Sequence, residues 1–103
     1  SIAESSIKSG NAEIEDMSAV TSVTGTVNIS ANTNTDGLIH WIAVFDKTTN
    51  ECKSLKIQSI AAGETGEKTI TTNTFEASDN NYVKMFVTDK LFKPVFGIEH
   101  FRR

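Results

Sequence analysis

The hydrophobic residues of this chain fall into short runs in which apolar and polar positions alternate. Alternation with a period of two places every second side chain on the same face of a β-strand. The clearest run spans residues 82–89, where Val83, Met85 and Val87 share one face. The sequence predicts about seven strands. They are placed at residues 12–17 (weakly alternating), 26–31, 38–45, 52–60, 68–75, 82–89 and 95–101.

Segments rich in Asn, Asp, Gly and Thr separate these runs, and such residues favour turns. No run has the spacing of an amphipathic helix. We therefore expect an all-β fold, an antiparallel two-sheet sandwich of about seven strands, with a small barrel as the alternative. Residues 1–11 are small and polar and predict a linker or a loosely attached N-terminal segment. The single sandwich domain is expected to span residues 12–103.

The run at residues 38–45 is apolar on both faces, which indicates a central strand. One face carries Trp41 between Ile39 and Ala43, and we expect this face to form the core. The opposite face carries His40 and Ile42. If this strand neighbours the one at residues 82–89, the side chains of His40, Ile42, Lys84 and Phe86 form one candidate ligand-binding patch. Burial of that patch under the N-terminal segment or a neighbouring domain is the alternative interpretation.

Charge and composition exclude several partner classes. Ten basic and thirteen acidic residues give a net charge of −3. Because nucleic-acid binding needs a basic stripe against the phosphates, no nucleic-acid partner is expected. No apolar run reaches the roughly 18 residues of a membrane span, and no signal peptide is visible. The chain starts with Ser1, as a processed or excised fragment does, and its lone Cys52 allows no intrachain disulfide.

Candidate chemistry is sparse, and we expect no enzyme. His40 and His100 lie on separate predicted strands, and neither has a nucleophile or carboxylate motif beside it. No cluster has zinc-ligand spacing, and the Asp residues sit in or beside turns without an Asp-x-Asp calcium loop. No cofactor and no metal site are predicted. Tyr82, near the start of the penultimate strand, resembles a tyrosine corner whose hydroxyl bonds back to the preceding loop.

Three motifs resemble those of fibronectin type III-like, immunoglobulin-like accessory modules from clostridial and related Gram-positive secreted or surface proteins. They are WIAVFD at residues 41–46, IQSIAAGET at residues 57–65, and VKMFVTD followed by FKPV at residues 83–89 and 92–95. Thr88 stands where the family usually has Trp, and one residue is missing before Lys93. The resemblance implies a sandwich, a multidomain parent protein and an extracellular or cell-surface location, and it implies no activity.

Two functions remain open at this point. The first is a non-catalytic accessory, spacer or adhesion module whose partners are the neighbouring domains of a larger extracellular bacterial protein. The second is a carbohydrate-binding module that holds a polysaccharide or cell-surface glycan on an exposed apolar and aromatic sheet face. The exposure of Phe86 and Ile42 separates them, because a coplanar exposed pair favours sugar binding and a covered pair favours the spacer.

Overall fold

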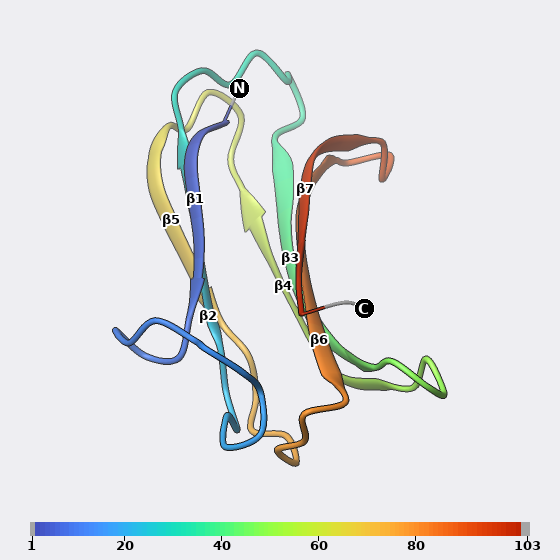
Figure 1. Ribbon diagram of the computed structural model, residues 1–103. Helices are drawn as coiled ribbons and strands as arrows, with labels where there is room; N and C mark the ends of the chain where they lie inside the picture. Colours follow the sequence, from blue (N-terminus) through green and yellow to red (C-terminus); the bar gives the residue numbers. More distant parts are fainter. Residues whose placement is uncertain (1, 102–103) are drawn as a thin grey trace.

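The computed structural model describes residues 2–101 and folds them into two antiparallel sheets packed face to face (Figure 1). The strands are β1 (Ile2–Lys8), β2 (Thr24–Ile29), β3 (Leu38–Asp46), β4 (Cys52–Ile60), β5 (Gly66–Thr71), β6 (Asn81–Asp89) and β7 (Pro94–His100). The first sheet has the order β1-β2-β5 and the second the order β4-β3-β6-β7. The predicted all-β two-sheet sandwich is thereby confirmed.

The strands with the strongest alternation were located best from the sequence. β4 has the predicted bounds, and β3 and β6 each differ from the prediction by one residue at one end. β5 ends at Thr71, four residues before the predicted end at Phe75. Beyond Thr71 the chain still bonds to the segment before β2, since the amides of Thr72 and Phe75 donate to the carbonyls of Val23 and Thr21.

The N-terminal segment differs from the prediction. Residues 2–8 form β1, an edge strand that pairs antiparallel with β2, rather than a loosely attached linker. Ile7 of this strand is buried in the core. The predicted strand at residues 12–17 is instead part of the connection to β2, in which Met17 is 1 % exposed. The expected division into a linker and a domain starting at residue 12 was therefore wrong, because the edge of β2 supplies backbone partners that composition cannot indicate.

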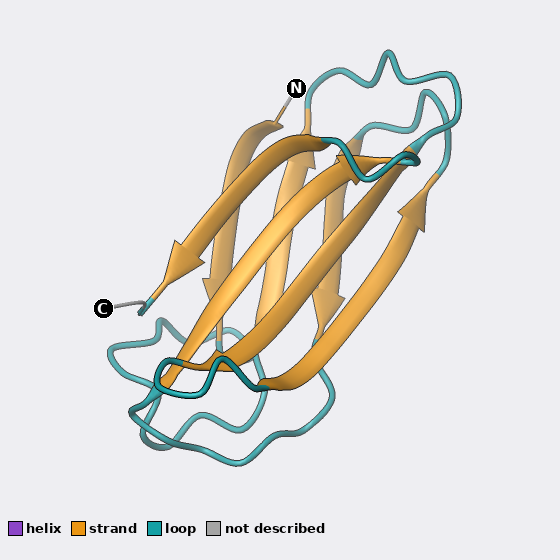
Figure 2. Cartoon of the chain, turned by 90° about the vertical axis from the view of Figure 1, so that its right-hand side faces the viewer, coloured by secondary structure: helices purple, strands orange, loops and turns teal. Residues whose placement is uncertain are grey.

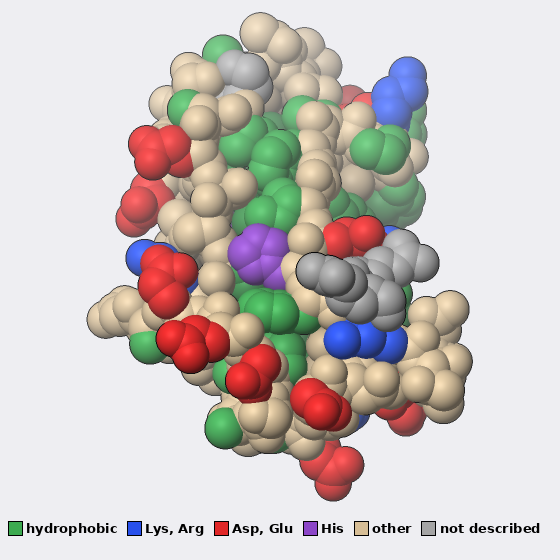
Figure 3. Space-filling model, in the orientation of Figure 1, with side chains coloured by type: hydrophobic (Ala, Val, Ile, Leu, Met, Phe, Trp, Pro, Cys, Tyr) green, Lys and Arg blue, Asp and Glu red, His purple; other side chains and the backbone are tan. Residues whose placement is uncertain are grey.

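The core occupies the space between the sheets, and Figure 3 shows its hydrophobic side chains along the seam between the two layers. Four successive inward positions of β3 are Leu38, His40, Ile42 and Val44, all at most 2 % exposed. His40, Ile42 and Val44 pair with Val87, Met85 and Val83 of β6, which also belong to the core. The sheets approach closely at Gly25 of β2, where a Cβ atom would meet the side chains of Met85 and Ile42.

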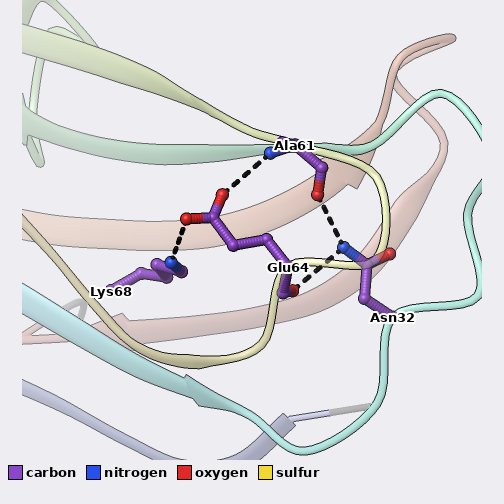
Figure 4. A network of polar contacts seen from close by, with 4 residues as sticks. All are labelled: Asn32, Ala61, Glu64 and Lys68. Carbon is purple, nitrogen blue, oxygen red and sulfur yellow. Dashed lines mark hydrogen bonds and ion pairs between the residues drawn. The ribbon is translucent and has the colours of Figure 1, made fainter.

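Polar contacts fasten the loops at one end of the sandwich (Figure 4). The Asn32 side-chain amide, in the loop between β2 and β3, donates to the carbonyls of Ala61 and Glu64, each at 3.2 Å. The Glu64 carboxylate accepts from the Lys68 ammonium at 2.6 Å and from the Ala61 amide at 3.0 Å. Both bonds lower the pKa of Glu64, and the bond from Lys68 has the larger effect. The network ties the β4–β5 loop to the neighbouring β2–β3 loop.

Candidate binding face

The four residues predicted to form one patch lie on opposite faces of the four-stranded sheet. His40 and Ile42 point into the core, at 1 % and 0 % exposure. Lys84 and Phe86 lie on the outer face and are half-buried. Since Ile42 is covered, the patch predicted from His40, Ile42, Lys84 and Phe86 does not exist as one surface.

The error comes from the register between two neighbouring strands. Trp41 of β3 pairs with Phe86 of β6, so His40 pairs with Val87 and Ile42 with Met85. A shift of one residue between paired strands moves a whole set of side chains to the other face. Trp41 is half-buried on the outer face, so its expected place in the core was wrong, although its neighbours Ile39 and Ala43 are buried.

His40 is a buried histidine without a polar neighbour. Neither of its ring nitrogens has a hydrogen-bond partner among residues 2–101. Burial away from water disfavours the charged ring and lowers the pKa of His40 to about 4. His40 is therefore a neutral core residue at physiological pH and takes no part in a surface site.

Trp41 lies on the outer face of the sheet, which is the face towards the viewer in Figure 2. Its indole N–H donates to the Thr88 hydroxyl at 3.0 Å. Its ring stacks on Phe86 with centroids 5.4 Å apart and planes 11° apart, and it meets the Phe92 ring edge-on at 5.7 Å. These contacts hold Trp41 and Phe86 in fixed orientations on the sheet surface.

Exposed apolar side chains from β4 and from the β6–β7 turn extend this aromatic cluster. Leu55 and Ile57 of β4 are 50 % and 53 % exposed, and Phe92 is 63 % exposed. Ile57 is the cross-strand partner of Trp41. We call these five side chains the outer apolar patch: Trp41, Leu55, Ile57, Phe86 and Phe92.

The outer face of the other sheet has the opposite character. Its cross-strand pairs are hydroxyl pairs, with Thr24 and Thr71 oxygens 3.0 Å apart and Thr26 and Thr69 oxygens 3.3 Å apart. A solvated sheet face normally carries such polar side chains. The outer apolar patch departs from this rule.

A trough runs beside the outer apolar patch, over β7 at the edge of the sheet. Gly97, the cross-strand partner of Phe86, lines it together with Phe86 and Pro94. The ion pair between Lys84 and Glu99, 3.7 Å apart, also lines it. Its volume is about 500 Å³. The trough therefore combines an aromatic wall with a charged donor and a charged acceptor.

The remaining candidate residues add no reactive site. The Tyr82 hydroxyl donates to the Asn50 side chain at 3.5 Å, and its ring stacks on Phe45. The tyrosine-corner bond to the preceding loop stays a prediction. Cys52 is an exposed free thiol. Within residues 2–101, no three His, Cys, Asp or Glu side chains come together as metal ligands, and no helix could cross a membrane.

Sequence reasoning missed Leu55, Ile57, Phe92 and Gly97 as surface residues. Leu55 and Ile57 have the spacing of two that normally marks an inward face. In the structure Ser54 and Ile60 point inward instead, because β4 is the edge strand and its middle extends past the opposite sheet. The glycine at position 97, in the interior of a predicted strand, was the one signal available, since strand glycines often mark a close approach of another group.

Neither a scan against protein-family models nor a search of curated proteins found a match for this chain.

Proposed function

We propose that this chain is a non-catalytic accessory and adhesion module of a larger extracellular bacterial protein, and that it holds a partner on the outer face of its four-stranded sheet. One observation carries the proposal. The outer face of one sheet is polar and includes two hydroxyl pairs, whereas the outer face of the other carries the outer apolar patch, in which Leu55, Ile57 and Phe92 are exposed. Exposed apolar surface of this kind lowers the solubility of a protein, and proteins keep it where a partner covers it.

The shape of the sandwich supports a module that works in series with other domains. β1 begins near one end of the molecule, and β7 ends a little past its middle (Figure 1). A chain that enters along β1 and leaves along β7 thus advances part of the way along the long axis, whose extent is 39 Å. Seven strands divided into three and four are also compatible with the fibronectin type III-like resemblance and the surface location that it implies.

A carbohydrate-binding role is the second candidate, and a specific observation favours it. The stacked rings of Trp41 and Phe86 lie on the exposed face, which supplies the aromatic surface that the role requires. The residues that would act differ from the predicted set, since Trp41 takes the place expected of Ile42. Lys84 and Phe86 lie on this face beside Trp41, not beside His40 and Ile42.

Sedimentation with purified Gram-positive cell walls tests the adhesion proposal. The double variant Leu55→Ser/Ile57→Ser removes the exposed aliphatic part of the patch. We expect at least a tenfold loss of the bound fraction, at a melting temperature close to that of the unchanged protein. The double variant Thr26→Ala/Thr69→Ala alters the opposite face and serves as the control. Equal sedimentation of all three proteins, or no sedimentation of any, contradicts the proposal.

A further inference from the structure

Gly97 is a glycine that the fold does not require. All six glycines lie within the described residues, and four of them have φ between +62° and +95°, which favours glycine. Gly25 lacks space for a side chain. Gly97 has neither reason, because its φ lies outside the positive region and an added Cβ would meet only the Phe86 Cβ, at an ordinary 3.7 Å. A glycine inside a strand is destabilising relative to alanine, so its presence calls for another cause.

The reason for a glycine at position 97 lies in the row of side chains that crosses the four-stranded sheet. Ile57, Trp41 and Phe86 are successive cross-strand neighbours on β4, β3 and β6, and Gly97 occupies the fourth place on β7. Trp41 stacks on one side of the Phe86 ring. On the other side, where a residue of β7 would normally pack, Gly97 leaves the trough open. A flat group in the trough would continue the stack on Phe86.

The two charged side chains at the trough restrict the kind of flat group that can bind there. The Lys84 ammonium offers only donors and the Glu99 carboxylate only acceptors, and the two lie 3.7 Å apart. A partly exposed ion pair is weakly held, so the Lys84 ammonium can turn to a ligand at little cost. Neighbouring hydroxyls on one ring, each a donor and an acceptor, match this pair. The aromatic side chain of a protein partner would place an apolar edge against both charges.

We propose that the Gly97 trough is a saccharide subsite, in which the apolar face of one pyranose ring stacks on Phe86 and its hydroxyls bond Lys84 and Glu99. This inference rests on the proposed adhesion role of the same sheet face and names its ligand class. Trp41 orients the Phe86 ring from behind and is a positioning residue. The outer apolar patch continues the surface toward β4 for further units of the polysaccharide.

Trp41 is the single tryptophan of the chain and stacks on Phe86, so its fluorescence reports on the trough directly. Soluble oligomers of glucose, xylose and N-acetylglucosamine are the probes. We expect a saturable change of emission with at least one of them. Gly97→Val fills the trough and should weaken that binding at least tenfold, while its melting temperature stays equal or rises because valine favours strands. Ser6→Val is the matched control, because Ser6 lies on the outer face of β1, an edge strand of the other sheet. This variant should bind the oligomers normally.

Two results would overturn the inference. One is the absence of any emission change with all three oligomers, and the other is unchanged affinity in Gly97→Val. Cell-wall sedimentation separates this failure from that of the adhesion role. If Leu55→Ser/Ile57→Ser loses wall binding while the oligomers have no effect, the face binds a non-saccharide partner, such as a wall protein, and only the saccharide assignment fails. If neither variant changes wall binding, the adhesion role fails as well.

Discussion

Replacement of the buried histidine at position 40 by leucine should stabilise the protein, and should do so more strongly at acid pH. His40 is 1 % exposed, and neither ring nitrogen has a hydrogen-bond partner in the described part of the chain. Unsatisfied buried polar groups cost about 1–3 kcal/mol, which His40→Leu removes. The change of side-chain shape offsets up to about 1.5 kcal/mol of this gain. At neutral pH the net effect is therefore small and favourable.

The pH dependence is the sharper part of the prediction. The pKa of His40 is about 4 in the folded protein and close to its ordinary value of 6.5 in the unfolded chain. Above pH 6.5 both states are neutral at this residue, and the free energy of unfolding is unaffected. As the pH falls below 6.5 the unfolded state binds the proton first, so stability is lost until about pH 4. The loss amounts to about 2 kcal/mol at pH 5 and about 3 kcal/mol below pH 4.

Urea unfolding of both proteins at pH 7.5 and at pH 5 measures this difference. The stability advantage of His40→Leu should grow by about 2 kcal/mol between the two conditions. His100→Gln provides the comparison for the other histidine, which lies at the end of β7. An advantage of equal size at both pH values would show that His40 titrates alike in the folded and unfolded states. The assignment of His40 to a dry core would then be wrong.

Two further predictions concern stability. Gly25→Ala should lower the free energy of unfolding by about 1–2 kcal/mol in urea melts. The reason is that its Cβ would stand 2.9 Å from the Ile42 Cδ1 atom and would also press on Met85. An equally stable variant would show that the sheets can separate there at no cost. Asn32→Ala should cost about 1 kcal/mol in the same assay, since it removes two hydrogen bonds to the β4–β5 loop and the one that Asn32 accepts from the Asn34 amide. Asn32→Asp keeps the acceptor for Asn34 but sets a carboxylate oxygen against the two carbonyls, so it should cost at least as much.

The sequence predicted most strands because alternation is a local property. β3 and β6 each contain an apolar run long enough to mark its own ends, and β4 lies between two segments of turn residues. The sequence did not predict β1, because its apolar residues Ile2 and Ile7 are too few and too far apart to form an alternating pattern. It is a strand because β2 pairs with it from Thr24 to Ile29. Lys84 and Phe86 were placed on one face from their spacing, and the structure keeps them together on it.

The sequence by itself determined the fold class, the position of most strands and the lack of any recognised catalytic motif. Only the tertiary structure decided which face of β3 is the inner one. Both faces of this strand are apolar, so local hydrophobicity favours neither, and the choice depends on its register with β6 and on the approach of the second sheet at Gly25. That choice buries His40 and exposes Trp41. It thereby moves the candidate site to a different set of residues, with Phe86 and Lys84 as the members common to both.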